Sequence, residues 1–530
     1  MSFSHISILT LLILFSRGEK TIEVKSASDF KDVLPTDIKG PKSLSDDIAI
    51  IGAGPSGIHM AYLLKEKGFK NVKILERTNR LGGKSTSIKY RGTIHELGTV
   101  YISKDYEENV ISLLKQFTNN SLVPIPMASV WADNSTSGIP FATYIFLKLK
   151  SKYKDVSLDN LKKMYVSTIY KYIALHRSLF GEYKGELMPE PSEQTKSKIS
   201  GSFYDFLKRN ELEDLKDLLT ASFTLQGYGQ LDEVPALYGL LWNTPRLMQG
   251  IVSFLNGDDG GLYILSNGFE SLWSSMAITL DLDITYNISV RYIHIDDNAH
   301  DINGKTNKIF VYYKDDPKGP IKIESYDFLI WTPPVSKIVK LIGGKETKEE
   351  KKMFSSMEHT YYTTSLVDVF ESKRSVSPVD WWFDRIYSKQ NMAVWASRES
   401  YASTHGYHGY SYAEGKYPTG DDGDKKRTSV FYQYSKKKPN KRQLRSILKQ
   451  HLKNYGATRS RMLYQRKWPY FERFNFRDAE QGHHWKVLRL QGKHKIWFCG
   501  SSVSFESVKS VIEYNHLLVS RMKKPEVRID

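Results

Sequence analysis

The chain has 530 residues, of which 40% are hydrophobic and 13% aromatic, so it can bury a large core and is not a disordered chain. More than one core is expected at this length, and we predict two interwoven domains. The formal net charge of +17 favours anionic partners, but the basic residues are scattered and no nucleic-acid-binding motif accompanies them, so no nucleic-acid partner is expected.

Residues 1–18 have the pattern of a signal peptide. The apolar run from Ile6 to Phe15 has the length of a signal-peptide core, and the small residues Ser16 and Gly18 follow it. A membrane span needs roughly 20 apolar residues, and no stretch approaches that length, so no transmembrane segment is predicted. We therefore expect a protein that enters the secretory pathway and is secreted to the extracellular space. The alternative is a buried N-terminal strand or helix.

A βαβ unit is predicted after an exposed polar leader over residues 19–45. The apolar run 48–51 predicts a strand that is buried on both faces. Residues 55–67 carry apolar side chains at helical spacing, and residues 72–75 predict a second short strand. This succession is typical of a nucleotide-binding domain with a parallel sheet.

The loop between the first strand and the helix reads GAGPSG and fits the pattern GxGxxG. In that pattern Gly52 permits a tight turn, Gly54 lets the backbone approach a pyrophosphate, and Gly57 allows close packing of helix on strand. The helix begins with Pro55 and Ser56, where unpaired N–H groups and a partial positive charge favour a diphosphate.

An acidic residue follows the second strand. Glu76 lies nineteen residues after Gly57, where a carboxylate accepts hydrogen bonds from ribose hydroxyls. Strand, loop, helix, strand and acid together predict a dinucleotide site. A carboxylate at this place disfavours the 2′-phosphate of NADP.

The next segment, ERTNRLGGK, carries a more specific pattern. It resembles the signature of the flavin amine oxidase and phytoene desaturase superfamily, which implies FAD rather than NAD. Basic side chains there can neutralise a diphosphate, and the paired glycines let the backbone pass close to the cofactor. Its predicted site residues are Glu76, Arg77, Arg80, Gly82, Gly83 and Lys84.

The resemblance continues through the chain, over about residues 46–522. HELGT resembles the segment that passes near the flavin ring in that superfamily, ISV lies where a valine contacts adenine, and IWFCGS resembles the final cofactor strand. The N-terminus of the last helix would face the flavin and stabilise negative charge on it. The site residues that these segments imply are Gly98, Thr99, Val290, Gly500, Ser501, Ser507 and Val508.

The resemblance implies an α/β fold with a discontinuous Rossmann-like (GR2-type) FAD-binding domain and an inserted α+β substrate domain. We predict the FAD-binding domain in three parts and the substrate domain in two, of which the first is mainly helical. The FAD-binding parts are 46–104, 260–345 and 466–530, the last with a C-terminal helix. The substrate parts are 105–259 and 346–465.

Two side-chain types limit the chemistry. Cys499 is the single cysteine, which excludes an intramolecular disulfide, and it lies outside the segment used for covalent flavin attachment, so noncovalent FAD is expected. His483 and His484 have no third ligand at a suitable spacing, so no metal site is predicted.

Three N-glycosylation sequons are compatible with a secreted glycoprotein. We discount the last, because we expect it in the strand region that contacts adenine, where a glycan would clash with the fold. The sequons begin at Asn119, Asn134 and Asn287.

The resemblance implies an FAD-dependent oxidoreductase that transfers hydride from a substrate C–H bond to flavin N5. The C-terminal half, with WPYF at 468–471 and SFESV at 504–508, resembles a subgroup containing polyenoic fatty acid isomerases. An amine oxidase-like enzyme, an isomerase of polyunsaturated fatty acids and a non-catalytic FAD-binding protein therefore stay open. The expected partner is a small molecule, either an anionic unsaturated lipid or an amine. The sequence identifies no catalytic residue.

Overall fold

The computed structural model describes residues 37–103, 106–124, 128–132, 135, 137–183, 187–255, 262–300, 306–343, 348–371, 379–399 and 425–525. The predicted signal peptide, Asn134 and residues 19–36 of the predicted leader lie outside these ranges. The predicted signal peptide and secretion therefore stay predictions.

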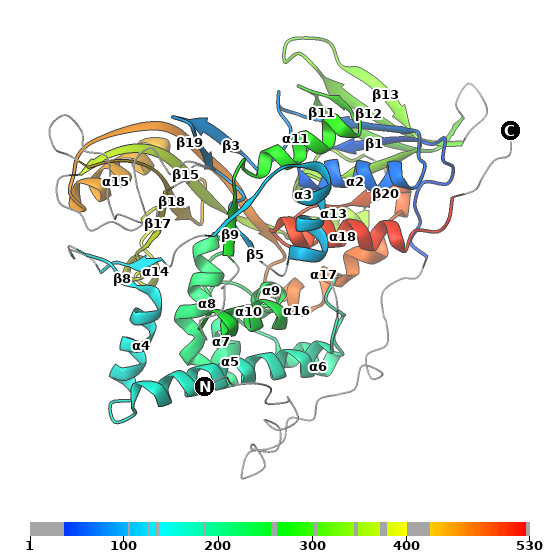
Figure 1. Cartoon of the computed structure of the whole chain (residues 1–530). Helices are drawn as coiled ribbons and strands as arrows, with labels where there is room; N and C mark the ends of the chain where they lie inside the picture. The colour runs from blue at the N-terminus through cyan, green and yellow to red at the C-terminus, as the bar shows by residue number, and fades with distance from the viewer. Residues whose placement is uncertain are drawn as a thin grey trace.

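A five-stranded parallel sheet forms the nucleotide-binding half of the molecule, on the right in Figure 1. Its strands come from distant parts of the chain and are ordered β10-β2-β1-β14-β20. Their bounds are β1 Asp47–Ile51, β2 Asn71–Leu75, β10 Asp283–Thr285, β14 Phe328–Trp331 and β20 Ile496–Phe498. Because β1 and β14 are buried on both faces, their residues are continuous apolar runs, as expected for the centre of a parallel sheet.

Helices cover this sheet, and a small sheet stands beside it. Helix α2 packs against both α18 and α11, so segments far apart in the sequence share one core. A separate antiparallel sheet is formed by β11, β12 and β13. The bounds are α2 Pro55–Glu66, α11 Phe269–Thr279, α18 Val508–Ser520, β11 Ser289–His300, β12 Thr306–Lys314 and β13 Lys322–Tyr326.

A seven-stranded mixed sheet forms the second half, on the left in Figure 1, with strand order β19-β15-β18-β17-β16-β7-β8. Its pairs are antiparallel apart from the parallel pair β16–β7. The bounds are β7 Ser129–Val130, β8 Ile139–Pro140, β15 Glu358–Glu371, β16 Val379–Trp381, β17 Val394–Glu399, β18 Lys425–Ser435 and β19 Ala457–Arg473.

A group of helices lies below the two sheets in Figure 1. The main ones are α4 Phe141–Lys152, α5 Leu158–Phe180, α7 Phe203–Arg209, α8 Lys216–Ser222, α9 Ala236–Trp242 and α10 Pro245–Leu255. Shorter helices and strands complete the described chain: α3 Ser112–Phe117, α6 Glu193–Lys198, α12 Val335–Ile338, α13 Lys348–Phe354, α14 Phe383–Tyr387, α15 Lys441–Asn454, α16 Phe476–Glu480, α17 His483–Lys486, β3 Ser87–Tyr90, β4 Thr93–Glu96, β5 Ile102–Ser103, β6 Leu122–Pro124 and β9 Leu262–Leu265.

The predicted fold class is confirmed: a Rossmann-like parallel sheet is combined with a mixed-sheet substrate half. The exact domain boundaries stay predictions. Segment 105–259 is mainly helical, and it also contributes the short strands β6, β7 and β8.

The prediction of an exposed leader is wrong for some of its last residues, because Ile38, Pro41 and Ser43 are buried while Lys39 and Lys42 are exposed. Ile38 is buried at 3% exposure, and its N–H donates to the carbonyl of Arg521 at 2.8 Å. The carbonyl of Lys39 accepts the indole N–H of Trp497 at 2.8 Å. These residues pack against the C-terminal part of the described chain, where the carbonyl of Arg521 and the indole N–H of Trp497 need partners, and no local pattern in the sequence shows this.

The expected position of Asn287 is also wrong. This residue lies in the turn between β10 and β11, with a φ of 62°, and its side chain is exposed. Asparagine tolerates this left-handed conformation, which explains the turn. A glycan on Asn287 would therefore not clash with the strand. The side chain of Asn119 is also exposed.

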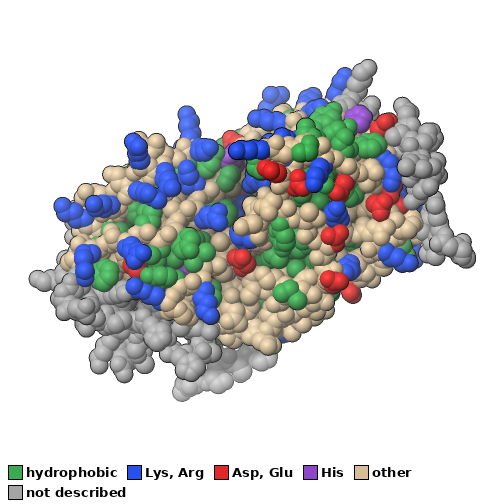
Figure 2. Space-filling view, turned by 90° about the horizontal axis from the view of Figure 1, so that it is seen from above, with side chains coloured by type: hydrophobic (Ala, Val, Ile, Leu, Met, Phe, Trp, Pro, Cys, Tyr) green, Lys and Arg blue, Asp and Glu red, His purple; other side chains and the backbone are tan. Residues whose placement is uncertain are grey.

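The surface shown in Figure 2 carries Lys and Arg side chains distributed over much of the face. They do not gather into one block, which agrees with the scattered pattern of the sequence.

Candidate functional site

A cavity of about 1470 Å³ begins at the carboxyl ends of the parallel strands and extends into the substrate half. Ile51, Leu75 and Trp331, at the ends of three of these strands, all line it. Ligands of open α/β sheets bind at this edge. The volume exceeds the roughly 300–1,000 Å³ of a typical small-molecule pocket, so a dinucleotide and a substrate can both fit.

The structure brings most of the predicted site residues to this cavity. Gly57 and Gly82 do not line it. The sixteen that do are Gly52, Gly54, Pro55, Ser56, Glu76, Arg77, Arg80, Gly83, Lys84, Gly98, Thr99, Val290, Gly500, Ser501, Ser507 and Val508. Their contact with a cofactor stays a prediction.

Gly57 has a packing role at the start of α2. A Cβ atom at this position would lie 1.9 Å from the carbonyl oxygen of Gly52, which belongs to the backbone and cannot move aside cheaply. The absence of a side chain therefore lets α2 begin directly beside β1. As a result, the N-terminus of α2 opens onto the cavity through Gly54, Pro55 and Ser56.

Glu76 is held in place by the glycine-rich loop and by its own turn. Its Oε2 accepts the N–H of Ala53 at 2.8 Å, and its Oε1 accepts the N–H and the hydroxyl of Thr78, both at 2.8 Å. A carboxylate has about four lone-pair sites, so it can still accept a bond from a ribose hydroxyl.

Two of the three basic residues of the ERTNRLGGK segment, Arg80 and Lys84, already contact protein groups. Arg80 donates to the carbonyls of Leu81 and Gly83 at 2.7 and 2.5 Å, and lies 3.4 Å from Glu270. Lys84 Nζ lies 2.5 Å from Oε1 of Glu506. Both side chains therefore stabilise the wall of the cavity. Their contact with a diphosphate stays a prediction.

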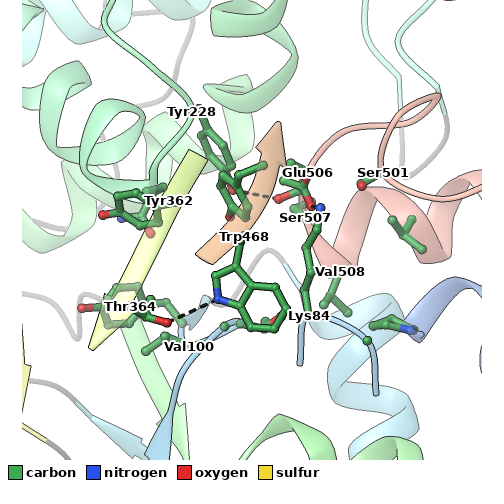
Figure 3. A pocket seen from close by; sticks show the side chains of 18 of the residues that line it. Lys84, Val100, Tyr228, Tyr362, Thr364, Trp468, Ser501, Glu506, Ser507 and Val508 are labelled. Atoms are coloured by element: carbon green, nitrogen blue, oxygen red, sulfur yellow. Dashed lines mark hydrogen bonds and ion pairs between the residues drawn. The ribbon is translucent and has the colours of Figure 1, made fainter. Parts of the chain in front are cut away.

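The segment around Gly98 passes close to Lys84. A Cβ on Gly98 would lie 1.5 Å from the carbonyl oxygen of Lys84, so only glycine fits there. The preceding carbonyl, of Leu97, accepts the indole N–H of Trp468 at 2.8 Å and the hydroxyl of Thr364 at 2.9 Å. Figure 3 shows Trp468 and Thr364 side by side in the cavity wall. The mixed sheet thus fixes this segment from the substrate side.

Glu96 does not line the cavity. It is buried, its Oε1 accepts the N–H of Phe269 at 2.5 Å, and its Oε2 accepts the hydroxyl of Ser87 at 2.8 Å. Burial raises the pKa of this carboxyl to about 7. It therefore anchors the start of α11.

The N-terminus of α18 opens onto the cavity. Ser507 caps the helix, because its hydroxyl oxygen accepts the N–H of Ser510 at 3.1 Å. Glu506 precedes it, and its Oε2 accepts the N–H of Phe471 at 2.9 Å while its carbonyl accepts the hydroxyl of Tyr228 at 3.0 Å. Figure 3 shows Glu506, Ser507 and Val508 grouped on one side of the cavity. The partial positive charge of a helix N-terminus therefore acts on this part of the site.

The sequence did not identify the aromatic residues that line the inner part of the cavity. They are Tyr101, Tyr106, Phe141, Tyr228, Trp242, Tyr362, Trp381, Tyr432, Trp468 and Tyr470. The rings of Tyr228 and Tyr470 are parallel, with centroids 6.0 Å apart. The chain has 57 tyrosines and phenylalanines together, and no pattern in the sequence separates lining residues from core residues.

Other features of the described chain are simpler. Cys499 is buried, and burial raises the pKa of its thiol, as for a core cysteine. His484 is buried in α17 and not in a polar loop. Within the described ranges, no cluster of three metal-ligating side chains occurs, and no helix is long and apolar enough to cross a membrane.

Comparison with known proteins finds one family model and several curated relatives. The model of the NAD(P)-binding Rossmann-like domain matches residues 50–117. The polyenoic fatty acid isomerase of Ptilota filicina is 26% identical over 218 residues, which cover 39% of this chain and 42% of the relative. The chain thus matches less than half the length of that curated relative.

Solved structures share the fold over most of the chain. A fatty acid isomerase from P. acnes that produces CLA has a TM-score of 0.69 at 21% identity, over 90% of this chain and 99% of that one. Putrescine oxidase bound to putrescine has a TM-score of 0.56 at 14% identity, over 90% and 99% of the two chains. These likenesses show that the chain shares the α/β Rossmann-like FAD-binding fold of amine oxidase structures.

Proposed function

We propose that this chain binds FAD noncovalently. The observations that support this are the glycine-rich start of α2, the anchored carboxylate of Glu76 and the N-terminus of α18, all on one cavity. The close packing of α2 on β1 at Gly57 sets the N-terminus of α2 at the edge of the cavity, where a diphosphate would bind. A bound flavin supplies a two-electron acceptor for a C–H bond of the substrate.

We propose further that the substrate is a polyunsaturated fatty acid and that the reaction moves one of its double bonds. The observation that carries this proposal is the continuation of the cavity, beyond the dinucleotide cradle, into a chamber with an apolar and aromatic wall that includes Phe141, Ile145, Leu218 and Leu225. Such a chamber suits a hydrocarbon chain and excludes water from it. The two fatty acid isomerases among the similar proteins favour this substrate over the oxidation that the motif resemblance put first.

The residues of the chain would serve this reaction by position and charge. The aromatic wall would hold the chain of the substrate in one conformation, so that a particular carbon faces the cofactor. The N-terminus of α18, capped by Ser507, would stabilise negative charge that develops near it.

Amine oxidation is a second candidate, because the aromatic wall that includes Tyr228 and Tyr470 could face an aliphatic amine. An amine oxidase would consume oxygen and release peroxide, whereas an isomerase needs no external oxidant.

The test is an anaerobic absorbance titration of the purified protein, first with arachidonate and then with a polyamine. A conjugated-triene band that rises with arachidonate, while the flavin bands stay oxidised, would support the isomerase. Flavin bands that bleach with the polyamine, and return in air with release of peroxide, would replace it with the amine oxidase. Stoichiometric FAD that responds to neither compound would favour a non-catalytic FAD-binding protein, and protein refolded with FAD that shows no flavin band would overturn the cofactor proposal.

A further inference from the structure

Arg398, in β17, lines the cavity with only 1% of its surface exposed. Its Nε donates to the hydroxyl oxygen of Tyr432 at 3.3 Å, its Nη1 to the carbonyl of Glu399 at 3.3 Å, and its Nη2 to the carbonyl of Glu96 at 3.1 Å. All three acceptors are neutral. The carboxylate of Glu399 pairs with Arg427 instead, and no ion pair joins Arg398 to any carboxylate of the described residues.

Three other cations of the cavity are in a different situation. Lys84 pairs with Glu506, and Arg246, whose side chain is 47% exposed, lies 3.6 Å from Glu108. Arg466 is exposed to solvent. Water or a carboxylate therefore compensates each of these charges. Arg398 is buried beside neutral acceptors, and a buried charge without an ionic partner is costly to a folded protein.

Glu96 is an acidic side chain that acts electrostatically on Arg398. Its two oxygens are engaged with the N–H of Phe269 and the hydroxyl of Ser87. Burial also raises the pKa of Glu96 to about 7, so near neutral pH this carboxyl is protonated in a large fraction of molecules. Glu96 therefore gives Arg398 incomplete compensation.

The guanidinium retains donors for a ligand. It has five N–H groups, and three of them make the bonds given above, so that each terminal nitrogen keeps one. A carboxylate can accept hydrogen bonds from both terminal nitrogens of a guanidinium. Apolar side chains such as Phe141, Ile145 and Trp381 line the same cavity.

We infer that Arg398 binds the carboxylate of the substrate and sets the end of the hydrocarbon chain in the cavity, with the hydroxyl of Tyr432 fixing the guanidinium. Arg398 is thus a positioning and specificity residue: it selects an acid over a neutral lipid and determines which carbon reaches the cofactor. The inference rests on the proposed function in one respect, that the substrate is a fatty acid with a hydrocarbon chain. Binding of the acid through Arg398 does not require that the protein isomerises it.

The test uses the flavin-loaded protein and oleate, which has no bis-allylic carbon, against methyl oleate, both below their aggregation limits. Calorimetric titration would show that the wild-type protein binds the acid at least about tenfold more tightly than the ester, as expected for a charge-assisted hydrogen-bond pair. Arg398→Met should lose this preference, and Arg398→Lys should keep part of it. Arg461→Met, which removes an exposed charge outside the cavity, is the matched control and should behave as the wild type.

Three results would overturn the inference: equal affinity of the wild-type protein for acid and ester, a full preference in Arg398→Met, or loss of FAD from a folded Arg398→Met. The first needs no variant, so it decides the question even where Arg398→Met does not fold. Turnover separates this inference from the proposed function. Oleate held through Arg398 by a protein that never shifts a double bond would refute only the isomerisation. Equal isomerisation of a polyenoic acid and its methyl ester would refute only the anchor.

Discussion

Nζ of Lys84 lies 2.5 Å from Oε1 of Glu506, and this ion pair joins the glycine-rich segment after β2 to the residue before α18. The two residues are 422 positions apart. The side chain of Glu506 is 7% exposed, and its second oxygen accepts the N–H of Phe471. Lys84 also lies 5.2 Å from the ring centroid of Tyr470. Lys84 thus connects the glycine-rich segment with the start of α18 (Figure 3). It also contacts β19, a strand of the substrate half, through Tyr470.

Removal of Lys84 alone should cost more stability than removal of the whole pair. Lys84→Met leaves the carboxylate of Glu506 buried without its cation, and we expect a loss of about 2–4 kcal/mol in the free energy of unfolding. Lys84→Met combined with Glu506→Gln should recover at least about 1 kcal/mol of this, because the unpaired charge is gone. Denaturant unfolding of the two single variants and the double variant measures the coupling. Strictly additive losses would mean that the pair contributes nothing.

The start of α2 should tolerate no side chain at Gly57. Because the new Cβ would meet the carbonyl oxygen of Gly52 at 1.9 Å, Gly57→Ala should lower stability by about 1–3 kcal/mol and reduce the FAD retained after gel filtration. Gly250→Ala is the matched control, since a Cβ there meets no atom within 4 Å. The ratio of flavin to protein absorbance gives the answer. Normal FAD content in Gly57→Ala would show that α2 and β1 can move apart while the cofactor site still binds FAD.

The two hydrogen bonds that the carbonyl of Leu97 accepts should contribute cooperatively to stability. Either Trp468→Phe or Thr364→Val leaves one hydrogen bond to this oxygen, and each should cost about 0.5–1.5 kcal/mol. The double variant leaves the carbonyl without either donor, so its loss should exceed the sum of the single losses. Chemical unfolding of the three variants tests this. A sum that is simply additive would indicate that water replaces the missing donors.

Stability should fall with pH through the ionisation of Glu96. Burial raises the pKa of this carboxyl from 4.5 to about 7 in the folded protein, so the folded state binds its proton more tightly than the unfolded chain does. The contribution is complete below pH 4.5 and is lost as the pH rises towards 7, by about 3 kcal/mol at most. Glu96→Gln cannot ionise, so its stability relative to the wild type should increase between pH 5 and pH 8. Unfolding curves at these two values measure the difference, and parallel pH profiles would contradict the shift.

The local sequence determined the first βαβ unit of the nucleotide-binding half. A buried strand, a glycine loop, a helix and an acid at fixed spacing are short-range patterns, because the backbone geometry that needs Gly52, Gly57 and Glu76 lies within one βαβ unit. The same holds for ERTNRLGGK, although the sequence did not show that Lys84 turns towards Glu506.

Only the tertiary structure decided which residues of the substrate half face the nucleotide-binding site across the cavity. Arg398 has no motif around it, and what distinguishes it is burial against Tyr432 and the carbonyls of Glu96 and Glu399 without an ion pair to a carboxylate of the described residues. Likewise, the burial of Ile38 depends on Arg521, at the other end of the described chain. Burial and pairing of this kind depend on contacts between residues that lie far apart in the sequence, and hydrophobic periodicity reports which face of an element is buried but not what it is buried against.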